Sequence, residues 1–460
     1  MTDKHTLIQP DKGQDAIPVR LVDKAGLDEF RKSLSPPQRA ALTAQKFEAE
    51  GYSHAILPDG DGWSVVAGVA NTESLSSWCM AKLAEVLPAG TYRREGGEPG
   101  PALFGWITGQ YRFDRYKSEP KVEGPRILLT KDVAAIDAAQ REAAAVALVR
   151  DLVNTPAEHM GPAELERTAE HLAKTHGATL RVTRGDALER DFPMVHMVGR
   201  AAARDAAPRL IELKWGDETH PRLAVIGKGV CFDSGGLDIK PASAMLLMKK
   251  DMGGAAHALA LARLIMEGSL KVRLHLVVPA VENAVSGSAF RPGDVLKSRA
   301  GLSVEIGNTD AEGRLILADA LALAGEAAPD LVIDFATLTG AARVALGPDL
   351  PALFARKDET AHALLDAGRE NDDPCWRLPL HEAYREYLKS DIADIDNSGS
   401  SGFAGATVAA LFMDRFVPED LDWAHFDTFA WRPAAKPGRP KGGDALGLRA
   451  AWHMVRARYA

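Results

Sequence analysis

Residues 223–241 of the chain read Leu-Ala-Val-Ile-Gly-Lys-Gly-Val-Cys-Phe-Asp-Ser-Gly-Gly-Leu-Asp-Ile-Lys-Pro. The apolar run 223–226 predicts a buried strand, and four glycines fall within the next ten residues. Glycine allows the backbone to turn tightly or to approach a ligand closely. The stretch therefore predicts a strand that ends in a functional loop, which presents Lys228, Asp233 and Lys240.

Strand-like and helical segments alternate around this stretch. Strands are expected at residues 179–182, 210–213, 223–226, 274–278 and 331–335, and helices at residues 162–176, 253–266 and 315–327. Such alternation is typical of an α/β fold, here with a mixed, largely parallel sheet between helices. Reactive residues in these folds gather at the carboxyl ends of strands.

The segments before this region predict a second, smaller domain. Short apolar runs separated by turns, with helical stretches at residues 27–48 and 73–86, are typical of a small α/β domain. An alanine-rich run of strong helix formers follows, and Asn154-Thr155-Pro156 ends it. We expect an N-terminal α/β domain at residues 1–130, a connecting helix at 131–153 and a catalytic domain at 154–460.

Composition excludes several classes of protein. The 460 residues are 46% hydrophobic and 26% charged, which is a globular profile. The first residues, MTDKHTLIQPDKGQD, lack the pattern of a secretory signal, and the sequence has no apolar run of about 18 residues. Three cysteines are too few for a disulfide framework. We therefore expect a cytoplasmic protein without a membrane partner.

The charge balance also bears on partners. A net charge of −8 argues against a chain-wide field that would attract nucleic acid, so nucleic acid is not the expected partner. A local basic strip occurs at residues 432–441, within a Pro/Gly/Lys-rich stretch at 432–443 that predicts an exposed loop.

A second charged cluster, Asn308-Thr309-Asp310-Ala311-Glu312-Gly313-Arg314-Leu315, precedes the expected helix 315–327. In an extended stretch alternate side chains share a face, so Asp310, Glu312 and Arg314 are expected to point into one cleft. Taken alone, the cluster is also compatible with helix capping and a surface ion pair. Asp251 is likewise compatible with an N-cap of the helix 253–266.

The two clusters together supply four carboxylates, those of Asp233, Asp251, Asp310 and Glu312. In a partly buried site they would repel one another unless cations neutralised them. Carboxylate oxygens suit magnesium, manganese and zinc alike. Two such ions about 3.5 to 4 Å apart would activate a water and polarise a carbonyl, so we expect hydrolysis.

The nearby cationic side chains have different expected roles. Lys228, beside two cations, could lose its proton and become a neutral ligand. Lys240, if farther away, would stay charged and stabilise an oxyanion. Arg314 remains cationic and could hold a small anion that acts as the base. Met248, one turn before Asp251, could line an apolar substrate pocket.

Other kinds of site are not supported. The segment from Gly227 lacks the G-x-x-x-x-G-K-[ST] order of a phosphate loop, and Ser234 lies outside a G-x-S-x-G context. The thirteen histidines form no H-E-x-x-H pair.

At both clusters the chain resembles the leucyl aminopeptidase (cytosol aminopeptidase) family of two-metal exopeptidases. The matching text is G-K-G-V-C-F-D-S-G-G-L-D-I-K-P from Gly227, M-K-K-D-M-G-G-A-A from Met248 and N-T-D-A-E-G-R-L from Asn308. The metal ligands implied by the resemblance are Lys228, Asp233, Asp251 and Glu312 for one ion, and Asp233, Asp310 and Glu312 for the other, with zinc or manganese bound.

The resemblance also implies how such a site works. Lys240 and Arg314 take the catalytic positions, with a bicarbonate ion near Arg314 as general base. Thr337, Leu338 and Gly340 bind the peptide substrate. The implied activity is release of apolar, leucine-like N-terminal residues from peptides, in a homo-hexamer of two trimers.

Residues in the region of the side-chain pocket differ from those usual in the family. The usual Asp-Ile-Ala-Gly stands here as Asp427-Thr428-Phe429-Ala430, in a region that helps to shape the pocket. The preferred first residue is therefore left open. Two alternatives also stay open: a dipeptidase selective for Cys-Gly with the same chemistry, and a nucleic-acid-binding hexamer with secondary peptidase activity.

Overall fold

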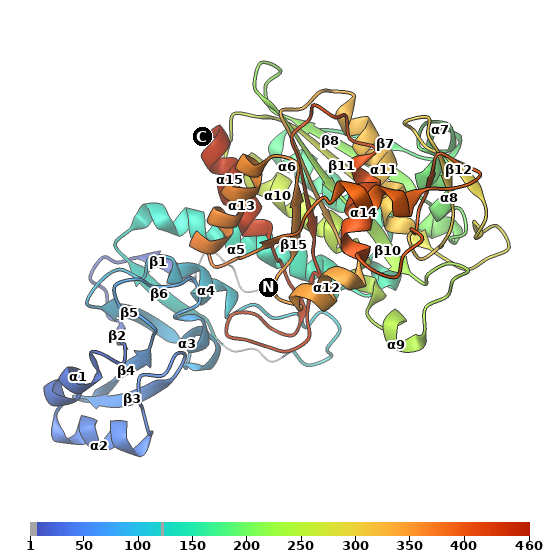
Figure 1. Ribbon diagram of the computed structural model, residues 1–460. Coiled ribbons are helices and arrows are strands. Elements are labelled where there is room, and N and C mark those ends of the chain that lie inside the picture. The colour runs from blue at the N-terminus through green and yellow to red at the C-terminus, as the bar shows by residue number, and fades with distance from the viewer. Residues whose placement is uncertain (1–6, 121–123) are drawn as a thin grey trace. The chain divides into compact units, whose positions relative to one another are not determined.

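A computed structural model describes residues 7–120 and 124–460, and the chain divides into two compact units (Figure 1). The first comprises Met1–Ala147 and Ala434–Lys441, and the second Leu148–Pro433 and Gly442–Ala460. Residues 1–6 of the polar N-terminal segment lie outside the described residues. Helix α5 (Val133–Asn154) occupies the segment where we expected a connecting helix, and the division between the units falls within it.

The described residues of the first unit form a six-stranded sheet with the order β1-β6-β5-β2-β4-β3. All neighbouring strands run parallel except β3 and β4. The elements are β1 (Ile8–Pro10), β2 (Ile17–Val22), α1 (Leu27–Ser33), α2 (Pro36–Ala44), β3 (His54–Asp59), β4 (Gly62–Gly68), α3 (Ala81–Val86), β5 (Gly90–Glu95), α4 (Ala102–Thr108) and β6 (Arg126–Thr130).

Two expected helices of this unit are shorter in the structure. The stretch 27–48 is split into α1 and α2, because Leu34 is extended and Ser35 begins a new helix with Pro36 at its first position. The Ser35 amide donates 3.0 Å to Gln38 Oε1, which completes a capping box. Of the stretch 73–86, only α3 is α-helical.

The second unit is built on a nine-stranded sheet with the order β16-β15-β18-β14-β9-β11-β8-β7, and β10 pairs with β11 off this path. The strands are β7 (Thr179–Thr183), β8 (Arg209–Trp215), β9 (Arg222–Gly227), β10 (Gly229–Asp233), β11 (Arg273–Asn283), β14 (Leu331–Ala336), β15 (Ala352–Ala355), β16 (Trp376–Arg377) and β18 (Trp423–Asp427). The central strands β18, β14, β9 and β11 are parallel, whereas β8, β7 and β15 join antiparallel neighbours.

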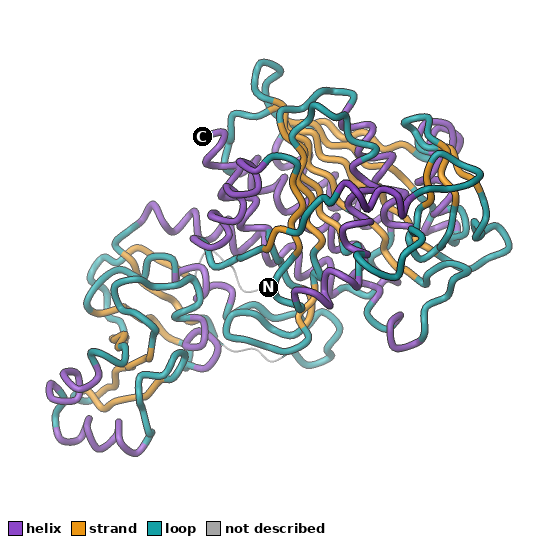
Figure 2. Tube along the Cα trace, in the orientation of Figure 1, coloured by secondary structure: helices purple, strands orange, loops and turns teal. Residues whose placement is uncertain are grey.

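Helices lie on both faces of this sheet (Figures 1 and 2). One face carries α6, α10 and α15, and the other α8 and α11, with α14 packed against α11. The helices are α6 (Pro162–His176), α7 (Gly185–Asp191), α8 (Pro193–Gly199), α9 (Ala242–Met245), α10 (Gly253–Glu267), α11 (Glu312–Gly325), α12 (Gly340–Leu346), α13 (Asp358–Glu370), α14 (Gly405–Asp414) and α15 (Leu448–Tyr459). The expected mixed α/β architecture is confirmed.

Strand β9 explains why the apolar run at 223–226 was informative. Leu223, Ala224, Val225 and Ile226 are all buried, because helices cover both faces of the strand. The remaining short strands form two small sheets, β12 (Val295–Lys297) with β13 (Ser303–Glu305) and β17 (Ile395–Asp396), and β19 (Trp431–Arg432) with β20 (Gly442–Gly443).

Two loop predictions were partly wrong. Residues 229–233, expected in the loop after β9, form strand β10, and a Cβ on Gly229 would lie 2.5 Å from Pro279 O on β11. The stretch 432–443 is not exposed throughout, since Arg432 is only 2% exposed and forms ion pairs with Asp444 and Asp349. A buried guanidinium needs such partners, which the sequence does not reveal.

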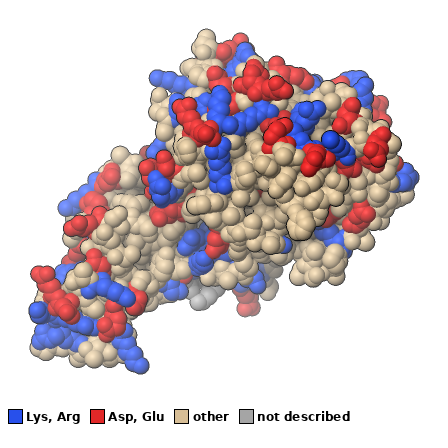
Figure 3. Space-filling model, viewed as in Figure 1, with Lys and Arg blue, Asp and Glu red and all other residues tan. Residues whose placement is uncertain are grey.

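Two surface properties bear on partners. Within residues 7–120 and 124–460, no helix is long and apolar enough to cross a membrane. Basic and acidic side chains are interspersed on the face drawn in Figure 3.

Candidate metal centre

The predicted metal-binding residues meet at the carboxyl ends of parallel strands in the second unit. Lys228 lies between β9 and β10, and Asp233 is the last residue of β10. Asp251 belongs to the 3-10 helix η4 (Met248–Met252), and Glu312 begins α11. Parallel strands that end at one sheet edge bring these distant segments together.

Glycines make room for the buried Lys228 side chain. The Lys228 amide donates 3.0 Å to Phe335 O on β14, and its carbonyl accepts from Ala255 N at 2.8 Å. A Cβ on Gly254 would lie 2.1 Å from Phe335 O, and one on Gly313 would lie 2.4 Å from Lys228 Cε. Gly254 and Gly313 are therefore required sterically, because a side chain at either position would collide with Phe335 O or with the Lys228 side chain.

Lys228 joins two of the carboxylates. Its Nζ lies 2.7 Å from Asp251 Oδ2 and 2.9 Å from Glu312 Oε1, and it donates 3.1 Å to Thr337 O. Burial alone would lower the pKa of Lys228, but the charges of Asp251 and Glu312 raise it above the ordinary value. Without metal, these two neighbours therefore favour the ammonium form of Lys228.

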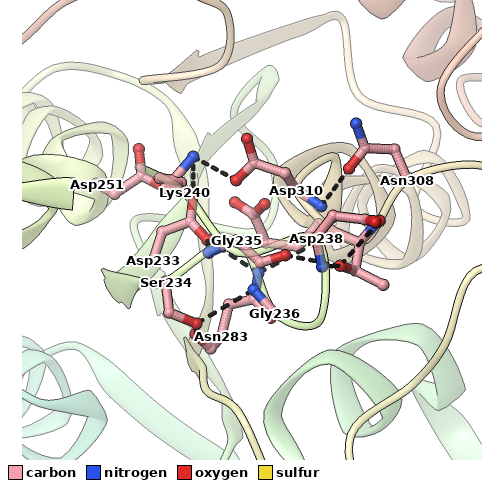
Figure 4. A network of polar contacts seen from close by, with 12 residues as sticks. Asp233, Ser234, Gly235, Gly236, Asp238, Lys240, Asp251, Asn283, Asn308 and Asp310 are labelled. Atoms are coloured by element: carbon pink, nitrogen blue, oxygen red, sulfur yellow. Dashed lines mark hydrogen bonds and ion pairs between the residues drawn. The ribbon is translucent and has the colours of Figure 1, made fainter. Parts of the chain in front are cut away.

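Lys240 joins the other two carboxylates (Figure 4). Its Nζ lies 2.9 Å from Asp233 Oδ2 and also pairs with Asp310 Oδ1. The loop that carries Lys240 turns through Gly235 and Gly236, whose φ values of 87° and 67° favour glycine. The Lys240 amide closes this loop by donating 2.9 Å to Ser234 O.

The carboxylate oxygens are poorly satisfied for buried groups. Ligand atoms of Asp233, Asp310 and Glu312 lie within 4.8 Å of one another, and Asp251 lies across Lys228 from Glu312. Among the described residues, Asp251 Oδ2, Asp310 Oδ1 and both Glu312 oxygens accept no hydrogen bond of acceptable geometry, despite nearby ammonium groups. Orphaned buried oxygens are costly unless a further cation or donor serves them.

The pKa values also reflect the crowding of buried carboxylates at this site. Burial raises the pKa of Glu312 to about 8, and the charge of Asp233 adds to the rise. Burial and Asp233 also raise the pKa of Asp310 to about 6. Glu312 and Asp310 thus resist ionisation where several carboxylates converge, which fits a site for divalent cations.

Asp310, Glu312 and Arg314 do not lie in the extended stretch that we expected. Only Asp310 precedes the helix, whereas Glu312 and Arg314 lie in the first turn of α11. Asp310 and Glu312 approach each other because a loop enters a buried helix, so the assumption of an extended stretch was wrong. The Asp310 amide donates 2.7 Å to Asn308 Oδ1, which holds this entry.

Asn397, which the sequence did not single out, organises this segment. Its Oδ1 accepts from the amides of Gly307 and Asn308 at 2.9 and 3.2 Å, and its Nδ2 donates 2.8 Å to Asn308 O. Its carbonyl accepts from Arg314 Nη1 at 2.5 Å. A single asparagine in a polar loop carries no sequence pattern that would predict this role. Asn283 is a similar case, since its Nδ2 donates 2.9 Å to Asp233 Oδ1.

Arg314 is buried and only partly paired. Among the described residues its Nε has no hydrogen-bond partner. Burial lowers its pKa to about 10, so it stays cationic at neutral pH. A buried guanidinium N–H with no acceptor is a fitting place for a small anion.

The predicted substrate-binding residues follow strand β14. Thr337 is buried, and its Oγ1 donates 2.8 Å to Asp251 Oδ1. The amide of Leu338 donates 3.0 Å to Asp427 Oδ1, which ties this segment to the end of β18. Gly340 is exposed at the start of α12, and Met248 is half-buried on η4.

Comparisons with known proteins match both units. The profile of the cytosol aminopeptidase family, catalytic domain, matches residues 147–451, and that of the M17 aminopeptidase N-terminal domain matches residues 17–128. The chain belongs to the cytosol aminopeptidase family. It is therefore a metal-dependent aminopeptidase, a hydrolase that acts on peptide bonds.

Individual relatives of the aminopeptidase agree with this assignment. A "Probable cytosol aminopeptidase" of Roseiflexus castenholzii is 38% identical over 91% of this chain and 88% of its own length. A crystal structure of cytosol aminopeptidase from Coxiella burnetii has a TM-score of 0.93 and 44% identity, covering 99% of this chain and 100% of that one. The bottromycin maturation enzyme BotP, solved in complex with Mn, has a TM-score of 0.86 and 31% identity, covering 97% and 100%.

Proposed function

We propose that this aminopeptidase releases apolar, leucine-like N-terminal residues from peptides by means of a pair of divalent cations, zinc or manganese. The observation that carries the proposal is the convergence of Asp233, Asp251, Asp310 and Glu312, of which the last three have shielded oxygens that accept no hydrogen bond from the described residues. Lys228, once it has lost its proton to become a neutral amine, would hold one cation together with Asp233, Asp251 and Glu312. Asp233, Asp310 and Glu312 would hold the other, together with the Asp310 carbonyl.

When bound, the cations would supply a water of lowered pKa and a polarised peptide carbonyl. The chain's own residues provide the rest. Lys240 is held by Asp233 and Asp310 in this structure, and neutralising those carboxylates would free its ammonium to stabilise the developing oxyanion. Arg314 would hold bicarbonate through its Nε, which pairs with no described residue, so that the anion accepts the proton of the attacking water.

Substrate would lie along the segment that follows β14. Thr337, Leu338 and Gly340 would bind the peptide backbone and α-amine, and half-buried Met248 would offer an apolar surface to the first side chain. We also propose a homo-hexamer, which light scattering of the purified protein would test.

Metal titration tests the central claim. The protein stripped with a chelator should lose activity toward leucine amide and recover it as zinc or manganese is restored, with two ions per chain by elemental analysis. A single bound ion at full activity, or full activity without metal, would contradict the two-metal proposal.

A further inference from the structure

Three buried titratable residues with no place in the reaction above lie on strands β14 and β18. Asp334 and His425 are fully buried, and Asp427 is only 4% exposed. Asp334 and His425 are partners in the register of the two strands, and Asp427 lies two residues farther along the same face of β18. Buried ionisable groups cost stability unless they serve one another, so their arrangement needs a reason.

Asp334 fixes the orientation of the His425 ring. His425 Nδ1 lies 2.6 Å from Asp334 Oδ1, and Trp423 Nε1 donates 2.7 Å to Asp334 Oδ2. The ring stacks on those of Phe354 and Trp423, whose centroids are 5.9 and 6.1 Å away. Burial alone would lower the pKa of His425, but the charge of Asp334 raises it above its ordinary value. The surroundings therefore favour an imidazolium ion inside the sheet.

The Asp427 carboxylate holds the segment that follows β14. Its Oδ1 accepts the amides of Leu338 and Thr339 at 3.0 and 3.2 Å, and its Oδ2 accepts from Thr339 Oγ1 at 2.6 Å. Thr339 Oγ1 in turn accepts the Ala342 amide at 3.0 Å, which caps α12. Burial raises the pKa of Asp427, whereas the charge of His425 acts to lower it. Among the described residues His425 Nε2 has no hydrogen-bond partner, so His425 acts on Asp427 through its charge.

The same segment is also fastened to the metal centre. Thr337 Oγ1 donates 2.8 Å to Asp251 Oδ1, and Thr337 O accepts from Lys228 Nζ at 3.1 Å. Residues 337–339 therefore connect the proposed metal ligands with Asp427. If the Asp427 end moved, a bound peptide would shift relative to the cations, and a displacement of about 1 Å is enough to cost about 10²-fold in rate.

We propose that His425 and Asp427 are positioning residues for the aminopeptidase reaction. Asp334 orients the His425 ring, and the charge of that ring keeps Asp427 ionised. Ionised Asp427 then fixes residues 338–340, because hydrogen bonds to a charged acceptor are stronger than those to a neutral one. This inference rests on the proposed function, because it takes this segment to bind the peptide backbone.

Steady-state kinetics of the metal-loaded, full-length protein test the proposal with leucine amide. Asp427→Ala should raise KM by about 10-fold to 100-fold, because the segment loses its acceptor. Asp427→Asn keeps an oxygen for the two amides but not the charge, and should raise KM by about threefold to tenfold. His425→Gln should have an effect of similar size, with bound metal at the wild-type level.

A double variant separates positioning from a merely structural role. If His425 acts by keeping Asp427 ionised, His425→Gln should not raise KM further when combined with Asp427→Asn. Acetohydroxamate, a small metal chelator that offers no peptide backbone, should inhibit every variant with the wild-type Ki. Asp319, which is buried in α11 and also accepts backbone amides, is the matched control, and Asp319→Asn should leave KM unchanged.

The outcomes also distinguish this inference from the proposed function. An unchanged KM in Asp427→Asn and His425→Gln, or KM effects that multiply in the double variant, overturns the positioning role while the aminopeptidase proposal stands. A weaker Ki for acetohydroxamate in these variants also overturns it, because the damage would then lie in the metal centre. The two conservative variants decide the question even if Asp427→Ala does not fold. No turnover of leucine amide by the metal-loaded wild type overturns both proposals.

Discussion

Two sets of buried carboxylates in the second unit differ in the hydrogen bonds and ion pairs that their oxygens accept. Asp319 accepts the amides of Met194, Val195 and Arg299 at 2.9, 3.3 and 2.8 Å. Asp373 likewise accepts the amides of Gly447, Arg449 and Ala450 at 2.9, 2.7 and 3.3 Å. The carboxylates of the metal centre instead face lysines and one another.

The comparison separates structure from function. Burial raises the pKa of Asp319 to about 7 and that of Glu312 to about 8, so a raised pKa marks both kinds of site. Of the two sets, only the metal centre leaves several shielded oxygens without a hydrogen bond from the described residues. Asp319 uses backbone amides to fasten α8 to α11, whereas Glu312 retains the capacity to bind a ligand.

The largest expected difference between the two sets is in metal binding. Asp233→Ala removes a carboxylate that both proposed cations share, so activity should fall by more than about 10³-fold and bound metal should be lost. Elemental analysis and kcat/KM measure the two effects. Asp319→Asn is the matched control and should keep its metal. Normal metal content and turnover in Asp233→Ala would place this carboxylate with the structural set.

A second variant distinguishes catalysis from metal binding within the centre. Lys240→Met should lower kcat by about 10²-fold to 10³-fold, because the oxyanion loses its cationic partner. Metal content should be retained, since Lys240 is not a proposed ligand. Loss of metal in this variant would show instead that Lys240 organises Asp233 and Asp310.

The structural set should respond in stability and not in chemistry. Asp319→Ala leaves the amides of Met194, Val195 and Arg299 without their buried acceptor, and should lower the free energy of unfolding by about 2 to 4 kcal/mol. Denaturant unfolding and kcat of the folded fraction are the measurements. An unchanged unfolding midpoint would show that Asp319 is not the structural cap inferred above.

The smallest expected difference is in the response to pH. The pKa of Glu312 is raised from 4.5 to about 8 and that of Asp310 from 3.8 to about 6, so the folded chain holds these protons more tightly than the unfolded chain. Their contribution to stability is full below the unfolded values and is lost as pH rises through the folded values. The metal-free protein should therefore lose roughly 3 °C in its unfolding midpoint between about pH 5 and about pH 8.

Metal should abolish this part of the pH response, because bound cations keep both carboxylates ionised. Asp319, whose pKa is also raised, should contribute its share with or without metal. Calorimetric scans of the two forms measure the difference. Identical pH profiles would mean that the cations do not act on Glu312 and Asp310.

Particular residues show how far sequence reasoning reached. The strand at 223–226 was located to within one residue at each end, because burial on both faces demands an uninterrupted apolar run. Strand β10 was missed because it begins only two residues after the end of β9, and its pairing depends on the close approach of β11. Asn397 was missed because its partners are spatial neighbours from other segments.

The sequence by itself determined the fold class, the family and the set of acidic and basic residues available for chemistry, because apolar periodicity and dense motifs are local properties of the chain. Only the tertiary structure decided which oxygens of the described residues are left without hydrogen bonds, and that Asn397 fastens the entry to α11. Such facts depend on distances between segments far apart in the chain, and packing alone sets those distances.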